Sequence, residues 1–228
     1  MNRHHQPPIV IWDCDGVVFD SNRAKIDAFQ AMLSERGAPD VDGKMRYIEA
    51  HPHETRFQLF SRWFSPAEAA ECIRAFSDQC ERMYQGLQPV PDVLALASAY
   101  DSAVISNSCQ QQLRRVFAHH QIAAYFRSGI YGSPETKRAH IERLPRGRIL
   151  AFVGDGELDW QTARHFGIPF LFVPMHSTWE TGIETCNACP GSTVCHTWAE
   201  CRAELERLWC GSSTERNQRN LTSESFID

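Results

Sequence analysis

Long apolar runs are absent from this sequence. Within its 228 residues, no apolar stretch approaches the roughly 18–20 residues that a membrane-spanning helix needs. The opening residues, MNRHHQPP, also lack the basic-then-apolar pattern of a secretory signal peptide. Basic residues are scattered and the formal net charge is −5, which disfavours a nucleic-acid or membrane-surface footprint. We therefore expect a cytoplasmic protein with no nucleic-acid or membrane partner.

Several common signatures are also missing. The sequence contains no P-loop, no GxGxxG fingerprint, no internal repeat and, despite ten histidines, no HExxH motif. Its nine cysteines are an odd number in a chain long enough to build a core without disulfides, so we expect reduced thiols. A zinc site at Cys186, Cys189, Cys195 and His196 stays an alternative, although the adjacent second pair departs from the usual ligand spacing.

What the sequence does contain predicts a doubly wound α/β fold with a parallel sheet. Short apolar runs with little polar alternation are typical of strands covered on both faces, and helix-like segments separate them. The expected strands are Ile9–Trp12, Ala103–Ile105, Ile130–Tyr131, Ile149–Val153 and Phe170–Val173. The expected helices between them are Gln110–His119, Glu135–Leu144 and Leu158–Phe166.

Residues 22–88 contain no convincing strand. Ile26, Phe29 and Leu33 follow helical spacing, and Ser65 with Glu68 forms a capping-box pattern at the start of a later helix. An all-helical insertion after the first strand is most simply a cap over the working edge of the sheet. The expected domains are an α/β core at 1–21 and 89–210, a helical cap at 22–88, and a disordered polar tail at 211–228.

Two carboxylates directly follow the first expected strand. In DCDGVVFDS, Asp13 and Asp15 lie one residue apart and Gly16 allows a sharp turn. Ligands of open α/β sheets gather at the carboxyl ends of the strands. Two acidic groups this close repel each other unless a cation or a shared proton intervenes, so we expect a hard metal ion such as Mg²⁺. A helix N-cap, a calcium loop or a solvated turn are the alternatives.

Polar residues also occur at the ends of later strands. VISNS ends one expected strand with Ser106 and Asn107, and VGDGELD ends another with Asp155, followed four residues later by Asp159. SPETKRAHI places Lys137 in the first turn of a helix, where a cation opposes the helix dipole unless an anion lies nearby. Considered one at a time, the strand-end residues could be ordinary turn residues, and Lys137 could be a surface lysine.

These segments, in this order, resemble the haloacid dehalogenase (HAD) superfamily, in its phosphatase branch with a small helical (C1-type) cap. Phosphoglycolate phosphatases and β-phosphoglucomutases belong to that branch. The resemblance runs from about Ile9 to Trp209 and implies a Rossmann-like core. One departure is Gly156, where relatives often carry serine, and this change removes no ligand.

The resemblance implies a role for each motif residue. Asp13 would be the nucleophile that forms an aspartyl-phosphate, and Asp15 the general acid and base. Mg²⁺ would be held by the carboxylates of Asp13 and Asp155 and by the backbone carbonyl of Asp15. Phosphoryl oxygens would be held by Ser106, Lys137 and the backbone amide of Asn107, with Gly16 as a further substrate contact. Asp159 would orient the metal's waters or Lys137.

The expected cap offers candidates for substrate contact. In GKMRYIEAHPHETRF these are Lys44, Arg46, His51, His53 and Arg56, of which Arg56 is the preferred one. A solvated helix surface is the competing interpretation for each. Two neighbours in the same segment, Met45 and Phe57, are expected in the core of the cap.

The combined prediction is a Mg²⁺-dependent phosphatase acting on a small phosphorylated metabolite. A sugar phosphomutase of the same family and a non-catalytic binding protein with this fold are the alternatives. Family members that cleave carbon–halogen bonds need no acid for the leaving group and lack the second aspartate. Because Asp15 is present, dehalogenation is disfavoured.

Overall fold

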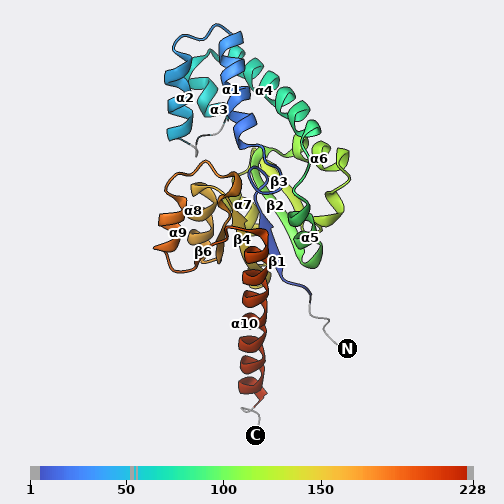
Figure 1. Ribbon diagram of the computed structural model, residues 1–228. Helices are drawn as coiled ribbons and strands as arrows, with labels where there is room; N and C mark the ends of the chain where they lie inside the picture. Colours follow the sequence, from blue (N-terminus) through green and yellow to red (C-terminus); the bar gives the residue numbers. More distant parts are fainter. Residues whose placement is uncertain (1–5, 52–53, 55, 225–228) are drawn as a thin grey trace.

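The computed structural model describes residues 6–51, 54 and 56–224. Within them lies a six-stranded sheet in the order β3-β2-β1-β4-β5-β6, with every neighbouring pair parallel (Figure 1). The strands are β1 (Ile9–Trp12), β2 (Asp101–Cys109), β3 (Gly129–Ser133), β4 (Ile149–Gly154), β5 (Phe170–Phe172) and β6 (Ser192–Val194). The predicted doubly wound parallel sheet is confirmed.

Successive residues of the central strand β1 enter opposite cores. Val10 and Trp12 pack into one buried cluster, while Ile9 and Ile11 pack into a second cluster on the other face of the sheet. This alternation follows from the two-residue period of a strand. It explains why the strand is apolar throughout, since each of its four side chains is at most 1% exposed.

Helices cover the sheet on both faces. They are α5 (Pro91–Ala99), α6 (Gln110–His119), α7 (Lys137–Arg143), α8 (Glu157–Phe166), α9 (Gly182–Asn187) and α10 (Trp198–Glu224). The edge strand β6 was not predicted, because its sequence STV is short and half-buried and gives almost no apolar signal. Because an edge strand is less covered than a central strand, its residues need not all be apolar.

Four helices stand between β1 and α5 in the chain and lie together beyond one end of the sheet (Figure 1). We call them the helical insert: α1 (Asn22–Glu35), α2 (Val41–Ala50), α3 (Arg56–Trp63) and α4 (Pro66–Gly86). The predicted start of α4 is confirmed, since the backbone N–H of Ser65 donates to Glu68 Oε2 at 2.9 Å.

The insert has an aromatic centre. The ring of Phe29 lies 4.0 Å from that of Phe76 and 5.5 Å from that of Phe60, between centroids. Met45 is buried as expected. The placement of Phe57 in this core was wrong, because its side chain is 67% exposed. α3 buries Leu59, and residues two apart on a helix point to opposite sides.

The last helix continues beyond the expected end of the folded chain. Residues from Gly211 to Glu224, expected to be disordered, are helical in α10, which extends away from the sheet on the side opposite the insert (Figure 1). Adding residues to an existing helix is far easier than nucleating one, and this can override a polar composition. No helix in the described part of the chain combines the length and apolar character needed to span a membrane.

Candidate active site

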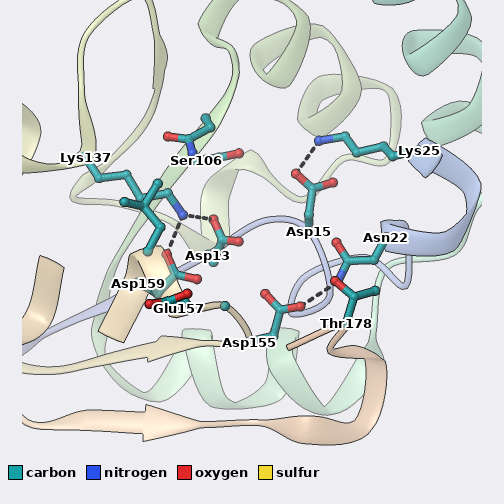
Figure 2. Close-up of a pocket in the computed structure, with 13 residues that line it drawn as sticks. Asp13, Asp15, Asn22, Lys25, Ser106, Lys137, Asp155, Glu157, Asp159 and Thr178 are labelled. Atoms are coloured by element: carbon teal, nitrogen blue, oxygen red, sulfur yellow. Dashed lines mark hydrogen bonds and ion pairs between the residues drawn. The ribbon is translucent and has the colours of Figure 1, made fainter. Parts of the chain in front are cut away.

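The predicted residues converge at the carboxyl ends of the central strands. Asp13 follows β1, Ser106 lies near the end of β2, and Asp155 follows β4. With Asp159 and Lys137 they line a cavity of about 200 Å³, which we call the catalytic cavity (Figure 2). Parallel strands that end at one edge bring these side chains together although they range from position 13 to position 159 of the chain.

Three aspartates and one lysine form the buried centre of this cavity. One carboxylate oxygen each from Asp13, Asp155 and Asp159 lies within 4.8 Å of the others, and no other such acidic, histidine or cysteine group occurs in the described residues. Lys137 Nζ donates to Asp13 Oδ1 at 2.6 Å and to Asp159 Oδ1 at 2.5 Å. The lysine is 6% exposed, so the surface alternative for it was wrong.

The electrostatics of this centre favour a further cation. Burial, followed by the neighbouring charge of Asp159, raises the pKa of Asp13 to about 7, although Lys137 acts in the opposite direction. Burial and the charges of Asp13 and Asp159 raise the pKa of Asp155 well above its usual value. One lysine therefore leaves three carboxylates short of positive charge. Carboxylate oxygens are the ligands that Mg²⁺ prefers, so the residues present fit this ion.

Gly16 is required by the closeness of Asp155. Its φ of +70° is in the left-handed region, and a Cβ on it would lie 2.1 Å from Asp155 Oδ2 and 2.5 Å from Asn22 Nδ2. A side chain could not be accommodated there without moving a group at the site. Gly16 does not line the catalytic cavity, and the substrate contact expected from the sequence stays a prediction.

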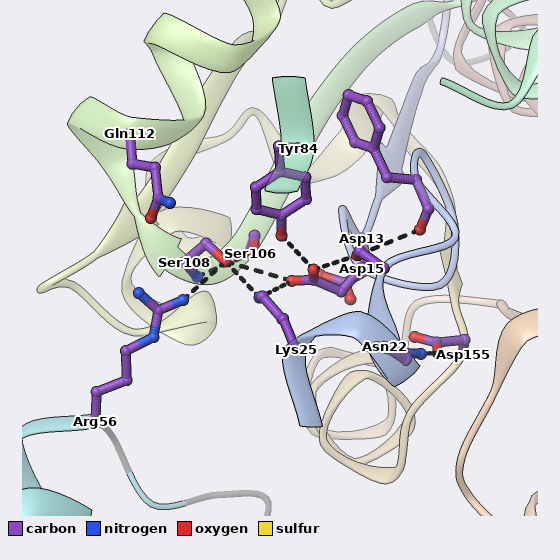
Figure 3. Close-up of polar contacts among 12 residues, drawn as sticks. Asp13, Asp15, Asn22, Lys25, Arg56, Tyr84, Ser106, Ser108, Gln112 and Asp155 are labelled. Atoms are coloured by element: carbon purple, nitrogen blue, oxygen red, sulfur yellow. Dashed lines mark hydrogen bonds and ion pairs between the residues drawn. The ribbon is translucent and has the colours of Figure 1, made fainter. Parts of the chain in front are cut away.

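Asp15 turns away from the acidic centre and accepts hydrogen bonds from four side chains (Figure 3). On Oδ1 the donors are Ser21 Oγ at 2.6 Å and the hydroxyl of Tyr84; on Oδ2 they are Lys25 Nζ at 2.5 Å and Ser108 Oγ at 3.3 Å. Burial alone would raise the pKa of Asp15, but the charge of Lys25 and these bonds lower it to about 2. The group is therefore ionised in this arrangement.

Sequence reasoning missed three residues that donate hydrogen bonds to Asp155 or to Asp15. Asn22 Nδ2 donates to Asp155 Oδ2 at 2.5 Å and to the carbonyl of His176 at 2.8 Å. Asn22 and Lys25 follow the DxDG motif closely and begin α1, so their position was a usable signal. Tyr84 lies near the end of α4, and nothing in the sequence connects it to Asp15.

The candidates on the insert separate into two groups. Arg56 and His51 line a second cavity of about 570 Å³ between the insert and the core. Arg56 also donates from Nη2 to Ser108 Oγ at 3.4 Å, one contact away from Asp15 (Figure 3). Lys44, bonded to the carbonyl of Pro39, and the exposed Arg46 line neither cavity. His53 lies outside the described residues.

The cysteine-rich segment does not assemble a metal site in the described structure. Cys186, Cys189, Cys195 and His196 all lie in the described part of the chain and do not form a ligand group there. Cys186 and Cys195 are instead buried in the two cores. All nine cysteines, each within the described residues, are free thiols.

Residues 10–173 match the sequence profile of the haloacid dehalogenase-like hydrolases. The chain belongs to this hydrolase family. Among solved structures, a haloacid dehalogenase-like hydrolase from Streptococcus pneumoniae is 22% identical with a TM-score of 0.67, covering 87% of this chain and 98% of that one. A protein from Clostridium acetobutylicum described as a predicted phosphatase is 17% identical with a TM-score of 0.66, covering 89% and 99%.

More distant in sequence is CbbY of Rhodobacter sphaeroides, solved with xylulose 1,5-bisphosphate. It is 13% identical with a TM-score of 0.57 and covers 76% of this chain and 89% of that one. At these identities the three structures establish the shared HAD fold.

The curated proteins that this chain matches are named as kinases, not as hydrolases. The tyrosine-protein kinase PtkA of Mycobacterium tuberculosis and of Mycobacterium bovis is 27% identical over 183 residues, which is 73% of this chain. The match extends over 62% of the length of those proteins, so the chain spans about three fifths of these relatives.

Proposed function

We propose that this HAD-like hydrolase is a Mg²⁺-dependent phosphatase that hydrolyses a small phosphomonoester through an aspartyl-phosphate on Asp13. The observation that carries the proposal is the convergence of Asp13, Asp155, Asp159 and Lys137 on one buried cavity. A negatively charged phosphate can approach a carboxylate nucleophile only where cations offset both charges. Lys137 supplies one such cation, and the carboxylates of Asp13 and Asp155 can hold a second one, Mg²⁺.

In the first step, a carboxylate oxygen of Asp13 attacks phosphorus while the bond from phosphorus to the ester oxygen breaks. Lys137, already within hydrogen-bond distance of Asp13, neutralises charge on the nucleophile and on the transferring oxygens. Ser106, which is buried at the cavity, contributes a hydroxyl beside them. Mg²⁺ held by Asp13 and Asp155, with the backbone carbonyl of Asp15, would supply further charge neutralisation.

Proton transfer is assigned to Asp15. The ester oxygen leaves as an alcohol after taking a proton from Asp15, and the carboxylate then takes a proton from the water that cleaves the aspartyl-phosphate. Inorganic phosphate and free Asp13 result. Because Asp15 is ionised when four donors surround it, the first of these transfers requires that donors such as Lys25 and Tyr84 withdraw. Both belong to the helical insert, so movement of the insert would provide that change.

The test is release of inorganic phosphate from a panel of phosphorylated metabolites with Mg²⁺ present. We expect Asp13→Asn to lose activity by a factor of about 10³ or more, since it removes the nucleophile, and EDTA to abolish activity of the parent protein. Asp27→Asn is the matched control, because Asp27 is an exposed acid of α1 paired with Arg23. Turnover by Asp13→Asn at the parent rate would exclude an aspartyl-phosphate on this residue.

The name of the curated relatives supplies a second candidate, protein tyrosine phosphorylation. A kinase would transfer phosphate from a nucleoside triphosphate to a tyrosine peptide, whereas a phosphatase would release phosphate from the phosphorylated peptide. Incubation with ATP and a tyrosine peptide, followed by mass spectrometry, separates the two. A phosphomutase would instead yield an isomeric ester and need a bisphosphate activator.

A further inference from the structure

The larger cavity adjoins the catalytic one. Its volume of about 570 Å³ lies between the insert and the core, and Lys25, Asn107, Lys137 and Leu158 line both cavities. If the proposed function holds, a phosphomonoester with its phosphorus at Asp13 extends its leaving group into this space. We call it the leaving-group cavity.

Its size leaves room for more than a very small leaving group. Cavities of about 300–1,000 Å³ are typical for ligands of drug size, and this one falls within that range. A two-carbon or three-carbon acid would leave most of the volume to water. The dimensions suit a leaving group that contains at least one ring.

Apolar side chains form much of the wall. Phe29 and Leu59 of the insert are buried, and Ile48 of the insert and Leu158 of the core are half-buried; all four line the cavity. Each hydroxyl of a sugar that lost water here would need a replacement hydrogen bond, and an unmatched one costs about 1–3 kcal/mol. The apolar part of this wall therefore favours the apolar face of a leaving group.

The acidic groups at this cavity are already engaged. Glu54 Oε1 accepts from Tyr47 and Arg62, and Glu135 pairs with Arg143. The buried Oε2 of Glu54 has no hydrogen-bond partner among the described residues. It can accept one hydroxyl or N–H from a leaving group, while the other polar groups of the lining come mostly from the core side of the cavity.

We infer that the leaving-group cavity binds the aromatic ring of an aryl phosphate, the phosphate ester of a phenol. Phe29 offers a ring for offset or edge-to-face contact. Arg56 has no carboxylate partner among the described residues, and its Cζ lies 4.8 Å from the ring centroid of Phe76. Its planar guanidinium can therefore contact a second ring in the same way.

Non-hydrolysable phosphonates test this binding without turnover. Calorimetric titration with Mg²⁺ present compares benzylphosphonate, the aliphatic cyclohexylmethylphosphonate of similar size, and the hydroxylated 3,4-dihydroxybutylphosphonate. We expect benzylphosphonate to bind about tenfold or more tightly than the hydroxylated compound, and about threefold more tightly than the cyclohexyl compound. Equal or tighter binding of either competitor would overturn the assignment.

Variants of Ile48 locate the ring. Ile48→Asn should weaken benzylphosphonate binding about tenfold while leaving the affinity for inorganic phosphate unchanged, and the milder Ile48→Thr covers the case in which Ile48→Asn does not fold. Ile73→Asn is the matched control, because Ile73 is partly buried in the same insert but does not line the cavity. Unchanged benzylphosphonate binding in the folded Ile48 variants would overturn the placement.

The two proposals fail in different ways. Phosphate release that depends on Asp13, combined with tight binding of the hydroxylated phosphonate, would remove the aryl assignment and leave the phosphatase intact. Ring-selective phosphonate binding without phosphate release from any ester would support the cavity assignment and contradict the proposed activity.

Discussion

Lys137 supplies the positive charge at the buried acidic centre. Its ammonium contacts both Asp13 and Asp159. Burial acts to lower the pKa of Lys137, but the two carboxylates outweigh this effect and raise the pKa above its usual value. Removing one partner of a buried ion pair leaves the remaining charges without compensation, which costs about 3–5 kcal/mol. The same lysine therefore supports the fold and the proposed chemistry.

We expect Lys137→Met to lower the free energy of unfolding of the metal-free protein by about 3 kcal/mol and to abolish phosphate release. Urea denaturation monitored by fluorescence measures the first effect. Arg138→Met is the control, since Arg138 is the exposed neighbour with no ion pair recorded among the described residues. Stability of Lys137→Met equal to that of this control would contradict the role of the lysine as counter-charge.

Gly16 illustrates a constraint of space rather than charge. A methyl group there would displace the Asp155 carboxylate or the Asn22 amide, in addition to the strain of a positive φ. We expect Gly16→Ala to weaken Mg²⁺ binding at least tenfold, measured by calorimetry, because Asp155 is a proposed ligand. Gly37→Ala also has a positive φ but meets nothing within 4 Å, so it isolates the backbone strain. Equal Mg²⁺ affinity in both variants would exclude the steric explanation.

The sequence permitted prediction of the side chains at strand ends but not of their partners on the insert. Asp13, Ser106 and Asp155 could be predicted because parallel strands place their carboxyl ends at one edge. The contact from Tyr84 to Asp15 depends on how α4 packs against the core, which no local spacing encodes. Side chains that tertiary packing brings to a site leave no periodic trace in the chain.

At the scale of elements, the clearest feature is that both ends of the helical insert contact Asp15. Lys25 is in the first helix of the insert, α1, and Tyr84 is close to the end of the last, α4. Whether a segment forms a helix or a strand was predictable from the spacing of its apolar residues. The bounds of β1 and α6 agree with the expected ranges. The polar edge strand β6 and the helical continuation past Gly211 were not predictable, because both depend on neighbouring structure.

Tyr84→Phe should raise the pKa of Asp15, because a hydrogen bond to the ionised carboxylate is one of the causes that lower it. The ring contact with Phe19, at 5.3 Å between centroids, is retained in this variant. Carbon-13 NMR titration of the Asp15 carboxyl measures the shift. In the control, Tyr47→Phe, the hydroxyl removed binds Glu54 and not Asp15. An unchanged pKa of Asp15 in Tyr84→Phe would mean that Lys25 and the serines alone determine its ionisation.

For the whole molecule, the acidic centre couples pH, metal and stability. Burial and neighbouring charge raise the pKa of folded Asp13 from its ordinary value to about 7. Between these two values the folded state binds more protons than the unfolded state, so the stability of the metal-free protein falls as pH rises through this range. Asp155, whose pKa is also raised, acts in the same direction.

Mg²⁺ should reverse this loss, since it binds the ionised carboxylates and competes with protons for them. We expect the increase in Tm on adding Mg²⁺ to be larger at about pH 8 than at about pH 5. Differential scanning calorimetry, with NaCl at matched ionic strength as the control, measures the difference. Asp155→Asn should reduce the Mg²⁺ effect at the higher pH, because it removes a proposed ligand. An increase of equal size at both pH values would show that the ion stabilises the protein elsewhere than at these carboxylates.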